Sequence, residues 1–131
     1  MPRVGHIILN VSDFDRSENF YDLILFAIGF ESNYREITQD VCLKSYRSNE
    51  HNIWIRREKN APTMQFVRNV GLDHLALFVD LHDDVNRMYE ELSTLNIKIT
   101  RPPSHYPEYS SNYYAFYFLD PDGIPLEIAY A

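Results

Sequence analysis

The feature that most constrains this chain of 131 residues is a pattern of segments that occurs twice along it. An apolar run at 4–11 precedes an amphipathic segment, and a second apolar run at 71–80 precedes another. A shift of 68 positions superposes His6 on His74 (74 − 6 = 68), although identity between the halves is sparse. An internal repeat of this length indicates a duplicated module. Because about 60 residues bury little core alone, the two halves are expected to pair.

Each half predicts the same order of elements. In the first half, residues 14–28 have helical spacing after a capping Ser12 or Asp13, and Gly29 is placed to end the helix. We predict an α+β fold of two paired βαβββ modules in one domain. The predicted segments are module 1 at about 1–60, a connector at about 58–69, module 2 at about 70–131, strands near 30–37, at 41–46, 52–57, 113–119 and 124–130, and a loop at 101–112.

The turn Asp120-Pro121-Asp122-Gly123 sets the register of the last hairpin. Proline suits the first corner of a type I turn, and Gly123 can take the left-handed conformation that closes the loop. Asp120 then pairs with Ile124, and Glu127 lies opposite Tyr117 on one face. The neighbouring apolar side chains point to the other face, towards a helix.

Three polar residues stand in otherwise apolar strands: His6, His74 and Glu127. Each has an ordinary explanation, since a histidine can be a hydrogen-bonded core residue and one face of the last strand can simply be wet. The repeat, however, relates the two histidines and could bring them together. Two imidazoles and one carboxylate on facing strands would hold a divalent metal ion and leave positions open for water or substrate.

Aligning the closing strands of the two halves places Trp54 where the second half has Glu127 (127 − 54 = 73). Tryptophan is not a metal ligand, so we expect three protein ligands, with Trp54 facing the site or serving as an ordinary core residue. Arg56 shares the face of Trp54 and could contact an anionic substrate group, or it could be a solvated arginine at a strand end.

Composition excludes several classes of function. The formal net charge of −7 argues against binding nucleic acid, and no run of about 18 apolar residues could span a membrane. The N-terminal residues lack a secretory-signal layout, and the single cysteine, Cys42, cannot form an internal disulfide. We therefore expect a cytoplasmic protein.

Three segments, VGHIILNVSDFDRSENFYDLILFAIGFE, GLDHLALFVD and YYAFYFLDPDGIPLEIAY, resemble the vicinal-oxygen-chelate superfamily over essentially the whole chain. This superfamily includes glyoxalase I, fosfomycin- and bleomycin-resistance proteins and extradiol dioxygenases. The resemblance implies that the paired modules form a curved, open sheet around a metal and substrate cavity. It also implies that His6, His74 and Glu127 bind one divalent ion (Fe, Mn, Ni, Zn or Co), which chelates adjacent oxygens of a small substrate.

The chain departs from individual members of this superfamily. Glyoxalase I has a carboxylate ligand where this chain has Trp54. The fosfomycin-resistance proteins have a threonine where Ile8 stands, and a late basic cluster, whereas no Lys or Arg follows Arg101 here. Fosfomycin modification is therefore not expected. The bleomycin-resistance proteins lack the metal triad.

The resulting prediction is a metal-dependent enzyme with lyase or isomerase chemistry of the glyoxalase type, or a dioxygenase if the metal is Fe(II). The alternative is a non-catalytic protein that binds or sequesters a small molecule. By resemblance we also expect a homodimer. The residues assigned to catalysis are Glu127 and Tyr117, and those assigned to substrate are Trp54, Arg56, Tyr113, Tyr117 and the loop histidine His105, with Tyr106 and Tyr109 shaping the cavity.

Overall fold

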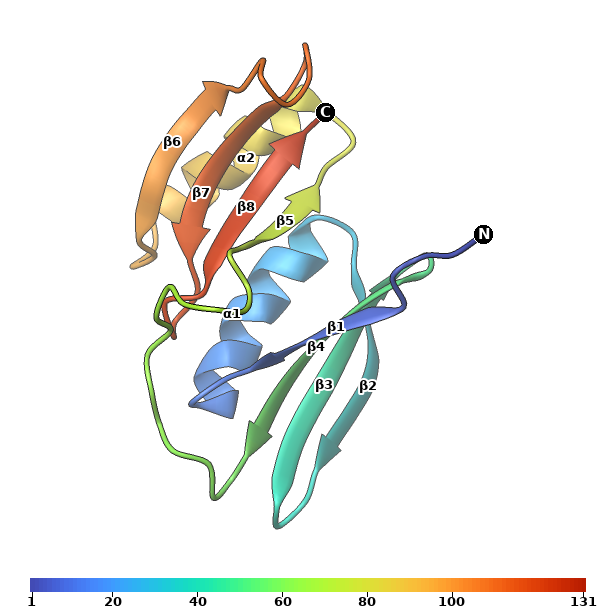
Figure 1. Ribbon diagram of the computed structural model, residues 1–131, viewed down its shortest axis with the longest axis vertical. Helices are drawn as coiled ribbons and strands as arrows, with labels where there is room; N and C mark the ends of the chain where they lie inside the picture. Colours follow the sequence, from blue (N-terminus) through green and yellow to red (C-terminus); the bar gives the residue numbers. More distant parts are fainter. The chain divides into compact units, whose positions relative to one another are not determined.

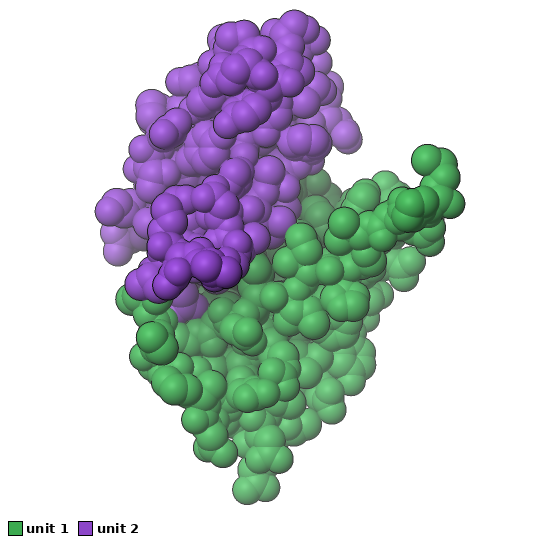
Figure 2. Space-filling model, viewed as in Figure 1, with its two compact units in different colours: residues 1–65 green, residues 66–131 purple.

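Burial alternates along the strands of the computed structural model, because each sheet has one face that packs on a helix. The structure describes residues 1–131 and divides them into two compact units, 1–65 and 66–131 (Figure 2). In each unit one helix covers one face of a four-stranded sheet (Figure 1). No helix in the structure has the length and apolar character needed to cross a membrane.

The first unit is a βαβββ module whose strands lie in the order β1-β4-β3-β2, with β1 parallel to β4. Helix α1 begins after Asp13, one of the two predicted caps, whose side chain accepts a hydrogen bond from the backbone N–H of Arg16 (3.1 Å). Gly29 follows the helix with a φ of 101°, a conformation that favours glycine. The elements are β1 (His6–Asn10), α1 (Phe14–Ala27), β2 (Glu31–Ile37), β3 (Val41–Ser48) and β4 (His51–Glu58).

The second unit repeats this arrangement, with strand order β5-β8-β7-β6 and β5 parallel to β8. The two units together confirm the predicted α+β fold of two βαβββ modules with open sheets. The predicted loop at 101–112 is wrong in its first part, because residues up to His105 belong to a strand. The elements are β5 (Leu75–Phe78), α2 (His82–Ser93), β6 (Ile99–His105), β7 (Tyr114–Leu119) and β8 (Pro125–Tyr130).

The register of the strands confirms the repeat at the level of single residues. Ile8 pairs with Trp54 in the first unit, and Ala76 pairs with Glu127 in the second. These pairs are related by shifts of 68 and 73 (76 − 8 and 127 − 54), the two values that the sequence predicts. Trp54 and Glu127 therefore occupy equivalent positions in their modules.

The β7–β8 hairpin has the predicted turn and register. The N–H of Asp120 donates to the carbonyl of Ile124 (3.0 Å), and Gly123 has a φ of 85°. Tyr117 lies opposite Glu127. The opposite face of the hairpin packs against α2 and is fully buried, with Phe116, Phe118, Leu126 and Ile128 in the core.

Candidate metal and substrate site

Glu127 is a carboxylate buried in the middle of β8, with only 1% of its surface exposed. Its Oε1 accepts a hydrogen bond from the Tyr113 hydroxyl (2.6 Å), and its Oε2 lies 3.0 Å from Nε2 of His74. The wet-face explanation for Glu127 is therefore wrong. A buried carboxylate is costly unless it is paired or binds a metal, and these two partners meet that requirement in part.

The orientation of His74 is set by its neighbour Asp73. Nδ1 of His74 lies 2.6 Å from Oδ2 of Asp73, and because a carboxylate only accepts, Nδ1 carries the proton. In the neutral ring, Nε2 then has a lone pair that faces the Glu127 carboxylate. Two acceptors 3.0 Å apart need a proton or a cation between them.

Tyr117 packs beside this pair, with its ring centroid 5.9 Å from that of His74. Burial, followed by the negative charge of Glu127, raises the pKa of Tyr117 above its usual value. Burial, followed by the hydrogen bond to Glu127, raises the pKa of Tyr113 in the same way. Both phenols therefore remain protonated at neutral pH and act as hydrogen-bond donors.

A cavity of about 480 Å³ opens beside His74 in the second unit. Tyr106 and Tyr109 contribute aromatic surface next to Tyr117, with the Tyr106 and Tyr117 ring centroids 5.7 Å apart. Of the four tyrosines predicted to shape the cavity, Tyr109 and Tyr117 line this one. The lining residues are Arg68, Asp73, His74, Thr100, Arg101, Tyr109, Tyr117, Leu119 and Pro125.

The other expected ligand, His6, lies in the first unit as the exposed first residue of β1, opposite Asn52. Trp54 and Arg56 lie in the same unit, two residues apart on β4. The Trp54 ring lies 5.8 Å from that of Tyr34, and Arg56 forms an ion pair with Glu58 (2.7 Å). Within either unit, no three His, Cys, Asp or Glu side chains form a group that could hold a metal ion.

His105 is not placed with the other predicted site residues. It is the last residue of β6 and pairs with Tyr114, whose hydroxyl donates to Asn86 of α2 (2.7 Å). Paired residues share a face, so His105 lies on the side of the sheet that α2 covers, opposite to Glu127. Its ring contacts those of Tyr114 and His82 instead.

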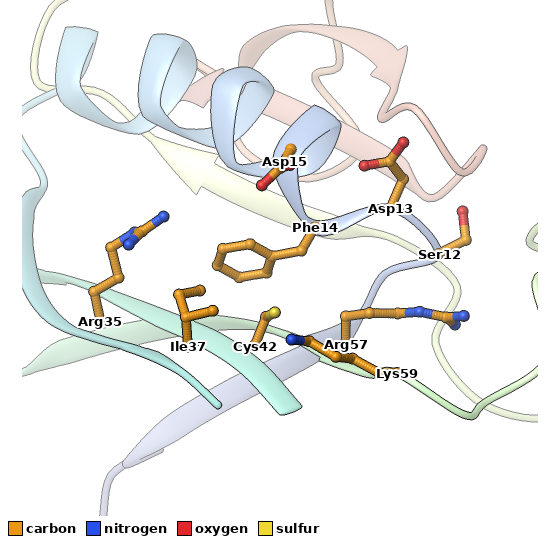
Figure 3. A pocket seen from close by; sticks show the side chains of 9 residues that line it. All are labelled: Ser12, Asp13, Phe14, Asp15, Arg35, Ile37, Cys42, Arg57 and Lys59. Carbon is orange, nitrogen blue, oxygen red and sulfur yellow. The ribbon is translucent and has the colours of Figure 1, made fainter. Parts of the chain in front are cut away.

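A second hollow, of about 470 Å³, lies in the first unit beside the first turn of α1 (Figure 3). Two of its charged side chains, Arg35 and Arg57, already have partners. Arg35 forms two hydrogen bonds with Glu18, and Arg57 donates to the carbonyl oxygens of Ala61 and Pro62. Cys42 lines this hollow and is buried. We assign no chemical role to Cys42.

Sequence reasoning missed two residues of the second unit, Asp73 and Arg101. Asp73 has a recognisable signal, since an acidic residue directly before a candidate histidine ligand can orient its ring. Arg101 has none, because it precedes two prolines in a segment without periodicity.

The chain thus has two βαβββ modules, the second of which carries a half-buried histidine beside a buried carboxylate. The model of the Glyoxalase/Bleomycin resistance protein/Dioxygenase superfamily matches residues 3–128. The chain therefore belongs to this superfamily. A comparison with curated proteins gave no match.

Several solved structures share the fold. A glyoxylase/bleomycin resistance protein/dioxygenase domain from Frankia sp. EAN1pec is 24% identical, with a TM-score of 0.82 and coverage of 100% of this chain and 98% of that one. A glyoxalase family protein from Enterococcus faecalis is 21% identical (TM-score 0.71, coverage 97% and 96%). The fosfomycin resistance protein FosX from Listeria monocytogenes, solved with Mn(II) and sulfate, is 16% identical (TM-score 0.71, coverage 100% and 93%). At these identities the similarity establishes the fold.

Proposed function

We propose that this protein is a metal-dependent enzyme that acts on a small substrate with adjacent oxygen atoms. The observation that carries the proposal is the buried carboxylate of Glu127, 3.0 Å from Nε2 of His74. A divalent ion held between these two atoms would compensate the buried negative charge. The Mn(II) in the structure of the related FosX supports the same reading.

The donor atoms fit such an ion. Two ligand atoms about 2.1 Å from a metal and at right angles to each other are about 3.0 Å apart, which is the separation between His74 Nε2 and Glu127 Oε2. A hydrogen bond from Nδ1 of a ligating histidine to a carboxylate is a common second contact of metal sites, and Asp73 supplies it here. Imidazole and carboxylate suit Fe, Mn, Ni, Zn and Co alike.

We propose His6 as the third ligand, contributed by the first module. The repeat makes His6 the counterpart of His74. The modules would pair either within a chain or between two chains of a homodimer, which is the assembly we propose.

When bound, the metal would act as a Lewis acid that polarises a substrate oxygen. Glu127 would bind the metal and move a proton at its second oxygen, which Tyr113 now occupies. Tyr117, protonated at neutral pH, would donate a hydrogen bond to a substrate oxygen. Trp54 and Arg56 would contact the rest of the substrate. Because Glu127 and Tyr117 would serve proton transfer, we favour isomerase or lyase chemistry over dioxygenation.

The second candidate is a protein that traps a small molecule without turnover. The tyrosine-lined wall formed by Tyr106, Tyr109 and Tyr117 favours it, since aromatic surface alone can hold a planar molecule. A protein of this kind would bind its ligand equally well with and without metal.

The test is the metal content of protein reconstituted with each divalent ion and freed of excess. The wild type should retain about one equivalent, and His6→Ala and His74→Ala should each lose most of it. His51→Ala is the matched control, because His51 is an exposed histidine at the start of β4. If the wild type retains no ion, or if the control loses as much metal as the two site variants, the proposed enzyme has no mechanism.

A further inference from the structure

Arg101 has a guanidinium group without a carboxylate partner in its own unit. It lines the cavity beside His74, and its Cζ lies 5.8 Å from the centre of the Tyr117 ring. The other arginine of the cavity, Arg68, is neutralised by Asp73. Arg101 therefore contributes an available positive charge, positioned against an aromatic ring.

The sequence around Arg101 fixes its backbone. Pro102 and Pro103 follow it directly, and a residue before proline is restricted to extended conformations. Irregularities of register lie on both sides, between Ile99 and Arg101 and between Arg101 and Ser104. The first of these makes Arg101, rather than Thr100, the partner of Tyr117. A bulge of this kind re-aims a side chain, here to the face of the candidate site.

Three residues form a row across this face of the sheet. Arg101 on β6 pairs with Tyr117 on β7, and Tyr117 pairs with Glu127 on β8. Neighbouring strands are about 4.8 Å apart, so the backbones of Arg101 and Glu127 are about 10 Å apart across the sheet. The arginine side chain can extend over part of this distance. The remaining space between the guanidinium group and Glu127 suits a small molecule with polar groups at both ends.

The charge of the cavity favours an anion at the Arg101 end. The chain as a whole has a net charge of −7, yet Asp73 is the one acidic residue that lines the cavity. Asp73 is already bonded to His74 and Arg68. A guanidinium binds planar or tetrahedral oxyanions through two parallel hydrogen bonds.

We propose that Arg101 binds the anionic group of the substrate, which is therefore a small molecule with a carboxylate or phosphate group at one end. That its other end lies at His74 and Glu127 rests on the proposed metal site. The anion subsite itself does not depend on the metal, and this allows the two proposals to be tested separately.

The test is a titration of metal-free protein with malonate and with inorganic phosphate, followed by the Nε–H signal of Arg101 in NMR spectra. The Arg101 signal is assigned as the one that is present in the wild-type spectrum and missing from that of Arg101→Met. One of the two probes should shift it saturably, with a dissociation constant on the order of 1 mM. The probe that binds more tightly distinguishes a carboxylate from a phosphate substrate. In the variants, which lack the Arg101 signal, binding is followed by the backbone amide signal of Tyr117, against whose ring Arg101 lies. Arg101→Met should weaken binding about tenfold, and Arg101→Lys by less, since it retains the charge without the paired donors.

Arg87→Met is the matched control, because Arg87 lies on α2 and is paired with Asp84 (2.8 Å). It should bind both probes like the wild type, and the neutral malonamide should bind to neither protein. Equal affinity in Arg101→Met and the wild type, or no saturable shift with either probe, would overturn the proposal. Metal retention, measured on portions of the same preparations after reconstitution with a divalent ion, separates the two proposals: anion binding without metal retention would rule out the metal site and leave the anion site in place.

Discussion

Glu127 is the most deeply buried carboxylate of the second unit. Its carboxylate is buried at 1% exposure, and the hydroxyl of Tyr113 is a donor that reaches it directly. A buried charged group that loses a hydrogen-bond partner keeps its full desolvation cost. The contact between Tyr113 and Glu127 should therefore have a measurable effect on stability.

Tyr113→Phe should lower the free energy of unfolding of the metal-free protein by about 1–3 kcal/mol, because it removes this donor. Urea denaturation followed by tyrosine fluorescence measures the change. Tyr109→Phe is the control, since the Tyr109 side chain is 64% exposed. Equal stability of the two variants would show that the hydroxyl of Tyr113 does not stabilise the carboxylate.

Asp73→Asn should weaken metal binding about 10- to 100-fold, because the ring of His74 loses the carboxylate that holds its Nδ1 proton. Competition with a chromophoric chelator measures the affinity. Asp83→Asn removes a similar charge from a side chain that is 99% exposed, and it should bind metal like the wild type. A loss of the same size in Asp83→Asn would mean that general charge, and not the contact with His74, sets the affinity.

The sequence predicted the candidate residues that are polar in apolar strands, such as His74 and Glu127. It could not predict their partners. Tyr113 is one of several tyrosines close together, and only the folded structure shows that its hydroxyl donates to Glu127. Arg101 depends on an irregular register that no spacing rule predicts. His105 was misplaced because the face of a strand cannot be assigned to a residue that is expected to lie in a loop.

At the scale of elements, the two helices begin in different ways. Asp13 caps α1 with its side chain, whereas Leu81 stands at the same position of α2 without a side-chain hydrogen bond. Asp13→Ala should cost about 1 kcal/mol of stability, and Leu81→Asp should add up to about 1 kcal/mol. Urea denaturation of both variants measures these two changes in the free energy of unfolding. No gain in Leu81→Asp would show that α2 does not need a cap.

An ion-pair cluster joins α1 to its sheet and makes stability depend on pH. Arg35 donates two hydrogen bonds to Glu18 (2.6 and 2.9 Å), and Lys44 lies 3.2 Å from the same carboxylate. The hydrogen bond from Arg35 is the main cause that lowers the pKa of Glu18 below its usual value. A lowered carboxylate pKa stabilises the folded state above the unfolded-state pKa, and this stabilisation is lost as the pH falls through the folded-state pKa.

Glu18→Gln should therefore be less stable than the wild type at pH 6, by up to about 1 kcal/mol for such a partly exposed pair. The difference should shrink as the pH falls below about 4.3, the usual glutamate value, and then disappear. Thermal unfolding at a series of pH values measures it. A difference that stays constant down to pH 3 or so would contradict the assigned pKa direction.

The elements themselves were largely predictable, since apolar runs and helical spacing are local signals. The exception is β6, whose sequence ITRPPSH contains two adjacent prolines. Proline has no N–H to donate to a sheet, and it is tolerated here because β6 is an edge strand. The sequence alone does not show that this segment will lie at the edge of a sheet. Its two prolines therefore predict a loop.

At the scale of the whole molecule, the proposed metal site takes ligands from both modules. Duplication of the strand register places His6 and His74 in equivalent positions, and Trp54 stands where the second module has Glu127. Each uncovered sheet face also exposes large apolar side chains, among them Ile8 (46%) and Phe78 (65%). Such surfaces are typical of regions that pack against another module or ligand.

The most direct test of this claim is titration of the metal-free protein with Co(II), followed by its visible absorption. One equivalent per chain should saturate the protein, with bands characteristic of nitrogen and oxygen ligands. Binding should be lost in His6→Ala and in the double variant His74→Ala, Glu127→Gln, and retained in His51→Ala. Saturable binding that persists unchanged in either of the two site variants, or no saturable binding by the wild type, would contradict the proposed site.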